Sequence, residues 1–430
     1  MNAPLNRIDS VTEPLSLPRL VATTREIDPV DALGCADPLN PTAWIRQGDG
    51  LVASGPDLLH IDVAEDGRIA AIADLWRALS HATDIDDEVG IPGTGLVGFG
   101  SFAFDESSAQ PSTLIVPTSV IGRRGGRSWL TRIRVADAPE SAPVREPVSL
   151  GPSWSATLGP GAMDPEAHDA AVREALAAIA SGEVSKVVIA RDLVGTVPAN
   201  ADLRRLVRIL ADGYPDTWIY AVDGMIGASP ETLVTVTGGT VAARVLAGTR
   251  PRGADARDDD AAAGSLRTSD KDGAEHRFAV DSVIDALNPH PSELRYGDPF
   301  ALELPNLWHL ATDVRGTLSG GASALDMVRA LHPTAAVAGT PTERAMAEIR
   351  RIEGLDRGRY AGPVGWIDAN GDGEWAIALR GAQFAPAEPG SAAPRAVSAH
   401  AGGGIVAGSV PEAELTETRI KFRPIVDALA

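Results

Sequence analysis

A strand that runs into three consecutive glycines near the end of the chain is the feature that most restricts how it can fold. Residues 395–406 have strand character and include Gly402–Gly404, where the absence of side chains lets a ligand approach the backbone closely. A helix is predicted directly afterwards, because Ser409 and Glu412 have the spacing of a capping box and Pro411 suits a first helical turn. The predicted unit is a strand, a short loop and a helix.

This predicted helix carries two acidic side chains and one basic side chain on a single face. Glu414, Glu417 and Lys421 are separated by three and four residues, which places them above one another on a helix. The two carboxylates repel each other unless a cation lies between them or solvent screens them. We therefore expect a magnesium site with a small anionic substrate held beside it.

The composition excludes several classes of protein. A formal net charge of −20 over 430 residues argues against nucleic acid or an anionic membrane as the partner. The single cysteine, Cys35, rules out an internal disulfide framework and a cysteine-based zinc site. No run approaches the roughly 18 apolar residues of a membrane span, and residues 1–20 lack the apolar core of a signal peptide. We expect a cytoplasmic protein that binds a small molecule, with a monomer as the default state.

Short apolar runs that alternate with turns predict an α+β fold, with large antiparallel β-sheets packed as a sandwich and helices outside. Residues 1–20 are expected to be a disordered lead-in, 21–150 an N-terminal β-rich portion, and 160–425 the catalytic portion of the same fold. The acidic run at 255–263 is expected to be a loop, and 374–384 a single strand.

Two local motifs match known binding signatures but have better explanations. Residues 93–98 match the glycine spacing of a dinucleotide site, yet strand-like residues follow where a helix is required. Residues 368–373 match the first half of a calcium-binding loop, yet Leu379 stands where that loop needs glutamate. Both are interpreted as tight turns.

A second acidic pair supports the metal hypothesis. Asp272 and Glu275 are three residues apart on a helix predicted over about 272–287. Such pairs arise often by chance in a chain with 58 acidic residues, and most are solvated. Two acidic helix faces without a cysteine–histidine cluster nevertheless favour magnesium or manganese over zinc.

Five further residues are candidates for chemistry or binding. Lys186 opens a β-branched strand and is either a solvated strand-edge lysine or, among apolar side chains, a base with a lowered pKa. Glu231 follows a Ser-Pro turn and is either an exposed carboxylate or a general acid with a raised pKa. Arg380 lies on the small-residue face of an apolar strand, where it needs an anionic partner. Tyr360 and His309 are either core or ligand-facing residues.

Taken in order, these residues resemble the chorismate-utilising enzyme family, and most closely its isochorismate synthases. The resemblance covers residues 160–425 strongly and the N-terminal third only loosely. Each stretch that carries it is modest, but their joint order is specific. The stretches are residues 185–191, 228–231, 246–250, 271–276, 331–341, 360–362 and 400–421.

The resemblance implies the chorismate-binding fold and a role for each candidate. A lysine matching Lys186 activates water for attack at C2 of chorismate, and a glutamate matching Glu231 protonates the departing C4 hydroxyl. The implied magnesium residues are Glu275 and Glu417 in direct contact, with Asp272 and Glu414 acting through water. The implied substrate-binding residues are Gly248, Thr249, His309, Tyr360, Arg380, Gly402, Gly404 and Lys421.

Two positions bear on the reaction within this family. Anthranilate-type relatives use ammonia and resemble one another in carrying glutamine at the position of Lys186, so lysine favours water as the nucleophile. Ala336 stands where salicylate and anthranilate synthases resemble one another in having threonine, so alanine favours an enzyme that stops at isochorismate. The product would feed siderophore or menaquinone synthesis. Pyruvate elimination to salicylate and a non-catalytic metal- or anion-binding protein remain as alternatives.

Overall fold

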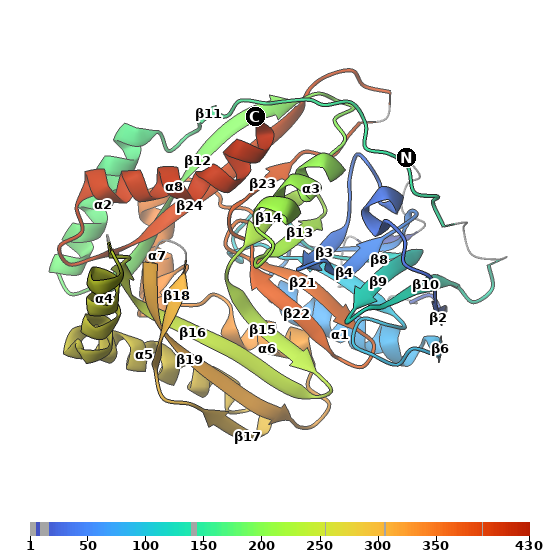
Figure 1. The fold of residues 1–430 in the computed structure, drawn as a ribbon, viewed down its shortest axis with the longest axis horizontal. Helices are drawn as coiled ribbons and strands as arrows, with labels where there is room; N and C mark the ends of the chain where they lie inside the picture. Colours follow the sequence, from blue (N-terminus) through green and yellow to red (C-terminus); the bar gives the residue numbers. More distant parts are fainter. Residues whose placement is uncertain (1–5, 9–16, 139–143, 254, 305–306, 389) are drawn as a thin grey trace.

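Two large β-sheets face each other in the computed structural model, which describes residues 6–8, 17–138, 144–253, 255–304, 307–388 and 390–430 (Figure 1). Within the described residues the first sheet has eleven strands. In spatial order they are β1 (Asn6–Ile8), β5 (Asp57–Val63), β8 (Ser112–Pro117), β7 (Val97–Ser101), β21 (Pro363–Asp368), β22 (Gly373–Ile377), β15 (Thr232–Thr237), β16 (Thr240–Pro251), β19 (Leu307–Leu318) and β17 (Pro291–Tyr296), with β18 (Phe300–Leu304) also paired to β19.

The second sheet has thirteen strands within the same described ranges. They are β11 (Gly159–Pro160), β12 (Lys186–Val197), β24 (Arg395–Val406), β23 (Gly381–Phe384), β14 (Met225–Ser229), β13 (Trp218–Val222), β3 (Ala43–Arg46), β4 (Asp49–Ala53), β9 (Ser119–Arg124), β10 (Arg127–Val135), β2 (Leu20–Glu26) and β6 (Asp84–Asp87), with β20 (Gly339–Thr340) also paired to β12. The pairs β1–β5 and β2–β6 are parallel, and the other described pairs are antiparallel.

Aromatic side chains hold the two sheets face to face. Trp44 and Trp129 from the second sheet and Phe99 and Trp366 from the first are all buried in one cluster. Each such side chain removes a large apolar surface from water, a contribution of about 1.5–3 kcal/mol per fully buried residue. The predicted sandwich is therefore confirmed.

Helices cover the outer faces of both sheets, also as predicted (Figure 1). On the second sheet α3 packs on β13 and β14 and α8 packs on β24, and Leu206, Phe422, Ala399 and Ala401 belong to the same buried cluster. α1 and α6 pack on the first sheet, and α2 lies beside α8 across β12. The helices are α1 (Arg68–His81), α2 (Pro165–Ala180), α3 (Arg204–Gly213), α4 (Ala256–Thr268), α5 (Asp270–Leu287), α6 (Ala324–Leu331), α7 (Thr342–Glu353) and α8 (Pro411–Leu429), and a short 3-10 helix spans Ala32–Cys35. No helix in the described part of the chain is long and apolar enough to cross a membrane.

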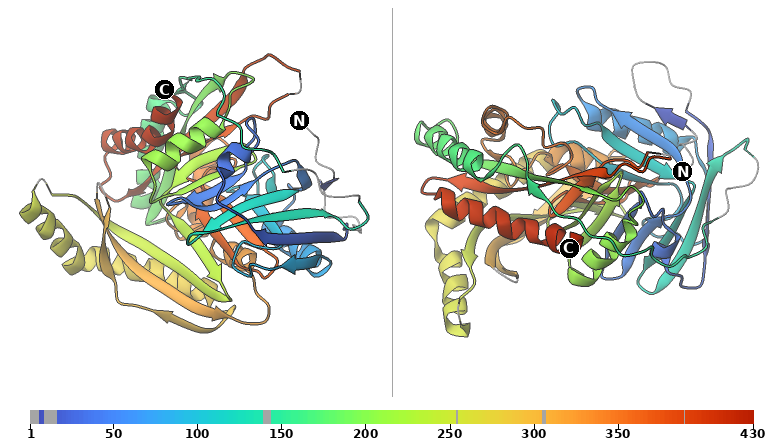
Figure 2. Two further views of the ribbon diagram at one scale, coloured as in Figure 1. Left: turned by 45° about the vertical axis from the view of Figure 1, so that its right-hand side comes forward. Right: turned by 90° about the horizontal axis from the view of Figure 1, so that it is seen from above.

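The first sheet extends beyond the sandwich with α4 and α5 packed on β16 and β19 (Figure 2). The prediction of a loop over 255–263 was wrong, because α4 begins there. Asp255 accepts hydrogen bonds from the backbone N–H groups of Arg257 and Asp258, and Asp258 and Asp259 occupy the first turn. Acidic residues at those positions satisfy and complement a helix N-terminus, so the aspartates favour the helix.

The N-terminal lead-in contains the short strand β1 and the first residue of β2. Asn6–Ile8 pairs with β5, Arg7 contacts Asp62 at 2.8 Å and Ile8 is buried. The expectation of disorder over residues 1–20 was therefore wrong for these three residues, because the first sheet offers them an edge, and for Leu20, which begins β2 and is buried. Residues 1–5 and 9–16 lie outside the described part.

Two of the places where the chain passes from one sheet to the other lie next to each other, the first crossing and the second crossing. β14 of the second sheet passes to β15 of the first through Ser229 and Glu231, and β22 passes back to β23 through residues 378–380. The prediction of a single strand over 374–384 was therefore wrong. Arg380 has a φ of 55°, so it turns the chain and does not continue a strand, and the alternation argument for its direction fails.

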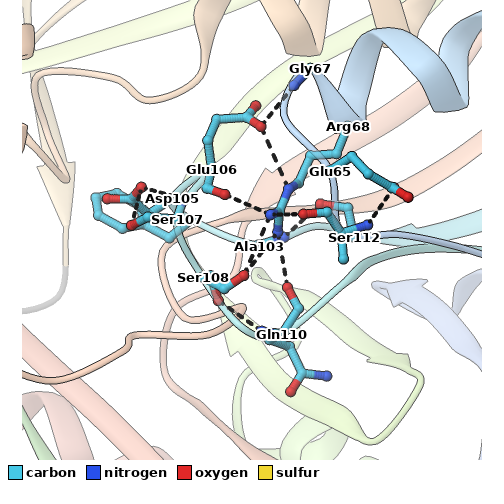
Figure 3. A network of polar contacts seen from close by, with 12 residues as sticks. Glu65, Gly67, Arg68, Ala103, Asp105, Glu106, Ser107, Ser108, Gln110 and Ser112 are labelled. Carbon is cyan, nitrogen blue, oxygen red and sulfur yellow. Dashed lines mark hydrogen bonds and ion pairs between the residues drawn. The ribbon is translucent and has the colours of Figure 1, made fainter. Parts of the chain in front are cut away.

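A buried arginine organises the loop that contacts the segment before Tyr360 (Figure 3). Arg68 at the start of α1 donates hydrogen bonds to the backbone carbonyls of Ala64 and Glu106, each at 2.6 Å, and to that of Gln110 at 3.0 Å. The loop so held contacts Asp356 through the backbone N–H of Ala109 at 2.9 Å. The N-terminal third thereby supports the segment that leads to Tyr360.

Candidate active site

Lys186 lies across the backbone of Gly404 on the neighbouring strand. β12 and β24 pair so that Val188 is aligned with Gly404 and Lys186 with Val406. A Cβ atom built on Gly404 would lie 2.8 Å from Cε and 3.5 Å from Nζ of Lys186. The glycine thus makes room for the lysine, which is half-buried.

Glu414 and Glu417 of α8 lie together over the next glycine. A Cβ atom on Gly403 would be 3.0 Å from Oε2 of Glu414 and 3.7 Å from Oε1 of Glu417. Burial raises the pKa of Glu414, a hydrogen bond from Ser409 lowers it, and the neighbouring charge of Glu417 raises it again. The predicted shared face of this helix is confirmed.

The predicted capping box at the start of α8 was wrong. The N-cap is Val410, with Pro411 in the first turn and without a side-chain cap. Ser409 instead accepts a hydrogen bond from the backbone N–H of Val406 at 3.2 Å and contacts Glu414. The serine therefore closes the turn between β24 and α8.

Lys421 and Tyr360 meet at the first glycine of the run. Nζ of Lys421 donates to the carbonyl of Gly402 at 2.7 Å and pairs with Glu417. The Tyr360 ring stacks on His400 with centroids 5.4 Å apart. Burial raises the pKa of Tyr360 to about 12, although a backbone hydrogen bond from Gly402 lowers it in part. The phenol therefore remains protonated at neutral pH and can donate a hydrogen bond.

Glu231 is held at the first crossing by main-chain contacts. Its N–H donates to Oγ of Ser229 at 3.2 Å, and its carbonyl accepts from the N–H of Ile377 at 3.0 Å. Burial raises the pKa of Glu231, and the nearby charges of Lys186, Lys421 and Arg380 lower it. These three cations come from different elements, so the carboxyl lies where they converge.

Arg380 occupies the second crossing, directly beside the first. Its carbonyl accepts from the N–H of Ala228 at 3.3 Å. Burial lowers the pKa of Arg380, and Tyr360, Glu231 and Glu417 raise it in that order. Among the described residues it forms no ion pair, so its guanidinium has capacity for an anion.

His309 is a residue of the first sheet that lies near Lys186 and Lys421. A bulge in β16 puts Gly248 at a φ of +79°, and its carbonyl lies 3.2 Å from Nδ1 of His309. Burial lowers the pKa of His309, and the positive charges of Lys186 and Lys421 lower it further. The histidine is therefore neutral and within electrostatic reach of both amines. The side chain of Thr249 lies outside the described residues.

The second half of the predicted metal site falls on α5. Asp272 and Glu275 lie in this helix, but their side chains are outside the described residues. Among the described side chains no group of three or more His, Cys, Asp or Glu could hold a metal. The Glu414–Glu417 pair does fit half of an all-oxygen magnesium site, because two carboxylates close enough to raise a pKa favour a shared cation.

A family model described as chorismate binding enzyme matches residues 7–430. The chain belongs to the chorismate-binding enzyme family. A Mycobacterium tuberculosis protein with the provisional name isochorismate synthase MenF is 38% identical over 354 residues, which cover 78% of this chain and 87% of that protein. The isochorismate synthase DhbC of Bacillus subtilis is 39% identical over 279 residues, which cover 62% of this chain and 68% of that protein.

A solved structure of the family shares this architecture. The Bacillus anthracis protein DhbC, provisionally described as a 2,3-dihydroxybenzoate-specific isochorismate synthase, superposes with a TM-score of 0.70 at 29% identity. The match covers 93% of this chain and 98% of that one. The whole fold is therefore that of a chorismate-binding enzyme.

Two residues at the site of this chorismate-binding enzyme were not predicted from the sequence. His400 stacks on Tyr360, and burial lowers its pKa to about 4, so it is a neutral wall. Ser229 is fully buried, and its hydroxyl donates to the carbonyl of Ile377 at 2.6 Å, which ties the two crossings together. The first could have been found from its alternation with Gly402 along one strand. The second had only the Ser-Pro turn as a signal.

A cavity of about 250 Å³ adjoins the second crossing. Tyr360 is the predicted site residue that lines it, together with His400, and Gly381 follows Arg380 directly. The remaining lining is Ala109, Gln110, Met225, Asp356, Arg357, Gly358, Arg359, Gln383 and Ser398. The stacked pair thus forms a wall shared between the site and this cavity.

Proposed function

We propose that this chain is an isochorismate synthase that converts chorismate to isochorismate. The observation that carries the proposal is a half-buried carboxyl, Glu231, at the first crossing, with Lys186, Lys421 and Arg380 close enough to act on its raised pKa. Exchange of a hydroxyl needs a protonated acid and a base on one substrate, flanked by cations that bind its carboxylates. The names of the two relatives give the same activity.

Substrate binding is assigned to residues that neutralise a dianion inside an acidic protein. Arg380 would take one carboxylate, because it lacks an ion pair in the described structure. Tyr360 would donate its phenol hydrogen, and Lys421, anchored at Gly402, would supply a second positive charge. Neutral His309 with Gly248 would close the first-sheet side of the substrate.

The chemical step is assigned to Lys186 and Glu231. The Lys186 amine must first lose its proton, and it then accepts a proton from water while the water oxygen forms a bond to C2. Glu231 gives its proton to the C4 hydroxyl, the C4–O bond breaks with a shift of the ring double bonds, and water leaves. One water is consumed and one is released, so the product is an isomer. Solvent then returns the proton from the lysine to the glutamate.

Magnesium would be held by Glu414 and Glu417, with Asp272 and Glu275 of α5 as the second half of the site. The bound ion would neutralise substrate carboxylate charge. Glu414 and Glu417 would fix the position of the ion, because both carboxylates lie together over Gly403. We propose a cytoplasmic location for the same enzyme, with a monomer as the default state.

Incubation of the protein with chorismate and Mg²⁺, followed by product identification, tests this function. Isochorismate without pyruvate is the expected result. Salicylate with pyruvate would replace the proposal with the lyase alternative. Unchanged chorismate would leave a binding protein and overturn the proposal.

A further inference from the structure

A buried hydrogen bond joins α8 to the strand that carries Lys186. Arg191 of β12 donates its Nε–H to Oγ1 of Thr418 at 2.8 Å. Arg191 is 4% exposed and Thr418 is fully buried. Thr418 directly follows Glu417 and lies one turn from Glu414 on the same helix. The bond therefore reaches α8 at the level of its acidic pair.

Arg191 has few other means of compensating its buried charge. Its guanidinium lies 5.1 Å from the ring centroid of Phe422, and within the described residues its Nη1 atom has no hydrogen-bond partner. Burial lowers the pKa of Arg191, and the positive charge of Arg419 lowers it further, while Asp192 raises it. The Asp192 carboxylate itself accepts the backbone N–H of Met163 at 2.8 Å. The bond to the threonine is thus the principal polar contact of a buried cation.

His168 of α2 does not replace that contact. It is fully buried, and in the described structure neither ring nitrogen has a hydrogen-bond partner. Burial lowers its pKa to about 4, and Arg191 contributes to the lowering. The histidine is therefore neutral and leaves Arg191 dependent on Thr418.

The orientation of the threonine hydroxyl is set by a second bond. Oγ1 of Thr418 donates to the carbonyl of Leu415 at 2.8 Å, so an oxygen lone pair is left for Arg191. Arg191 in turn is aligned with Ala401 of β24, next to the glycine run. The bond therefore links the glycine floor to the helix that stands on it.

We propose that the Arg191–Thr418 hydrogen bond sets the rotation of α8 and so holds the Glu414–Glu417 carboxylates in position for a divalent cation. Adjacent residues differ by about 100° around a helix axis, so a modest rotation would move both carboxylates off Gly403. Arg191 and Thr418 are positioning residues, since neither contacts the cation or substrate. The identity of the cation rests on the proposed function.

The test compares substitutions that remove one hydroxyl from α8. Thr418→Val removes the bond and keeps the shape, whereas Thr418→Ser keeps the bond. Thr416→Val is the matched control, because the Thr416 hydroxyl is exposed and donates only to the carbonyl of Glu412 at 2.8 Å in the same helix. Arg191→Met is a second variant that leaves Thr418 bonded to Leu415 and places no unpaired charge in the core.

The first readout is binding of Mn²⁺, as a spectroscopic stand-in for Mg²⁺, without substrate. We expect about tenfold weaker binding in Thr418→Val and Arg191→Met, the scale of one lost charge-assisted bond, and wild-type binding in Thr418→Ser and Thr416→Val. The second is amide hydrogen exchange over residues 411–421 in metal-free protein, which should become faster only in the first two.

Unchanged Mn²⁺ affinity in Thr418→Val, or equal weakening in Thr416→Val, would overturn the positioning role. A lower melting temperature with unaltered affinity would do the same, because it would mean a merely structural bond. Failure of the wild-type protein to turn over chorismate would remove the proposed function but not this inference, which the exchange and Mn²⁺ measurements test separately.

Discussion

Gly404→Ala should disable the enzyme without unfolding it. The added methyl would lie 2.8 Å from Cε of Lys186, while ordinary van der Waals contact begins at 3.4 Å, so the lysine stem must retreat by about 0.6 Å. Gly404 has no left-handed φ, so alanine is acceptable to the backbone. The atom that must move is near the end of a flexible side chain, so the strain on the fold is small.

The expected loss in kcat is on the order of 10- to 100-fold, because a displacement of about 1 Å can cost 100-fold in rate. The melting temperature should stay close to that of the wild type, since Gly→Ala at a compatible position contributes about 0.4–1 kcal/mol through the unfolded chain. Steady-state kinetics with chorismate at saturating Mg²⁺, together with thermal unfolding, measure both quantities.

The two preceding glycines supply matched controls. A Cβ on Gly403 would lie 3.0 Å from Glu414 Oε2, so Gly403→Ala should weaken Mg²⁺ affinity and spare kcat. A Cβ on Gly402 would lie 2.7 Å from the backbone carbonyl of Ile189, which cannot yield easily, so Gly402→Ala should lower stability by about 1–3 kcal/mol. Wild-type kcat in Gly404→Ala, or one common defect in all three variants, would refute this reading of the glycine run.

Substitutions at four other residues probe the site. Lys186→Ala and Glu231→Gln should each lower kcat by about 1,000-fold or more with the fold intact, and near-normal turnover would remove that residue from its role. Because the pKa of Glu231 is raised in the folded protein, Glu231 keeps its proton to higher pH there than in the unfolded chain. Its contribution to stability is therefore complete at low pH and is lost as the pH rises through the folded pKa. The melting temperature of Glu231→Gln relative to wild type should rise from about pH 4 to pH 9, and a constant difference would contradict the raised pKa. Arg380→Met should raise KM for chorismate by about 100-fold, whereas an unchanged KM would place the carboxylate elsewhere. His400→Phe should keep KM within about threefold because it preserves the stack on Tyr360, and His400→Ala should not.

Features written in a few consecutive residues could be predicted from the sequence. Asp164 followed by Pro165 is a helix-start signal, and Asp164 does cap α2, accepting from the backbone N–H groups of Glu166 and Ala167. The shared face of Glu414 and Glu417 followed from helical spacing alone. Such features depend on local backbone geometry, which the sequence specifies directly.

Features that depend on distant partners could not be predicted in this way. Nothing in the apolar run before Arg380 shows that the strand ends at Ile377, because the change of sheet depends on contacts with Ala228 and Glu231 far earlier in the chain. The bulge that aims Gly248 at His309 likewise depends on the pairing of β16 with β19. The resemblance to a family implied that Gly248, His309 and Arg380 belong to one site, whereas the local sequence pattern did not.

The paired crossings between the sheets have a consequence for how the site tolerates motion. The N–H of Ala228 donates to the carbonyl of Arg380, and the N–H of Ile377 donates to that of Glu231, so main-chain bonds connect the proposed acid to the proposed anion-binding arginine. Lys186 lies on a strand that does not cross. Any displacement of Glu231 is therefore transmitted directly to Arg380, whereas Lys186 is coupled to both through β24. The distance between the proposed base and the proposed acid accordingly depends on the pairing of β12 with β24.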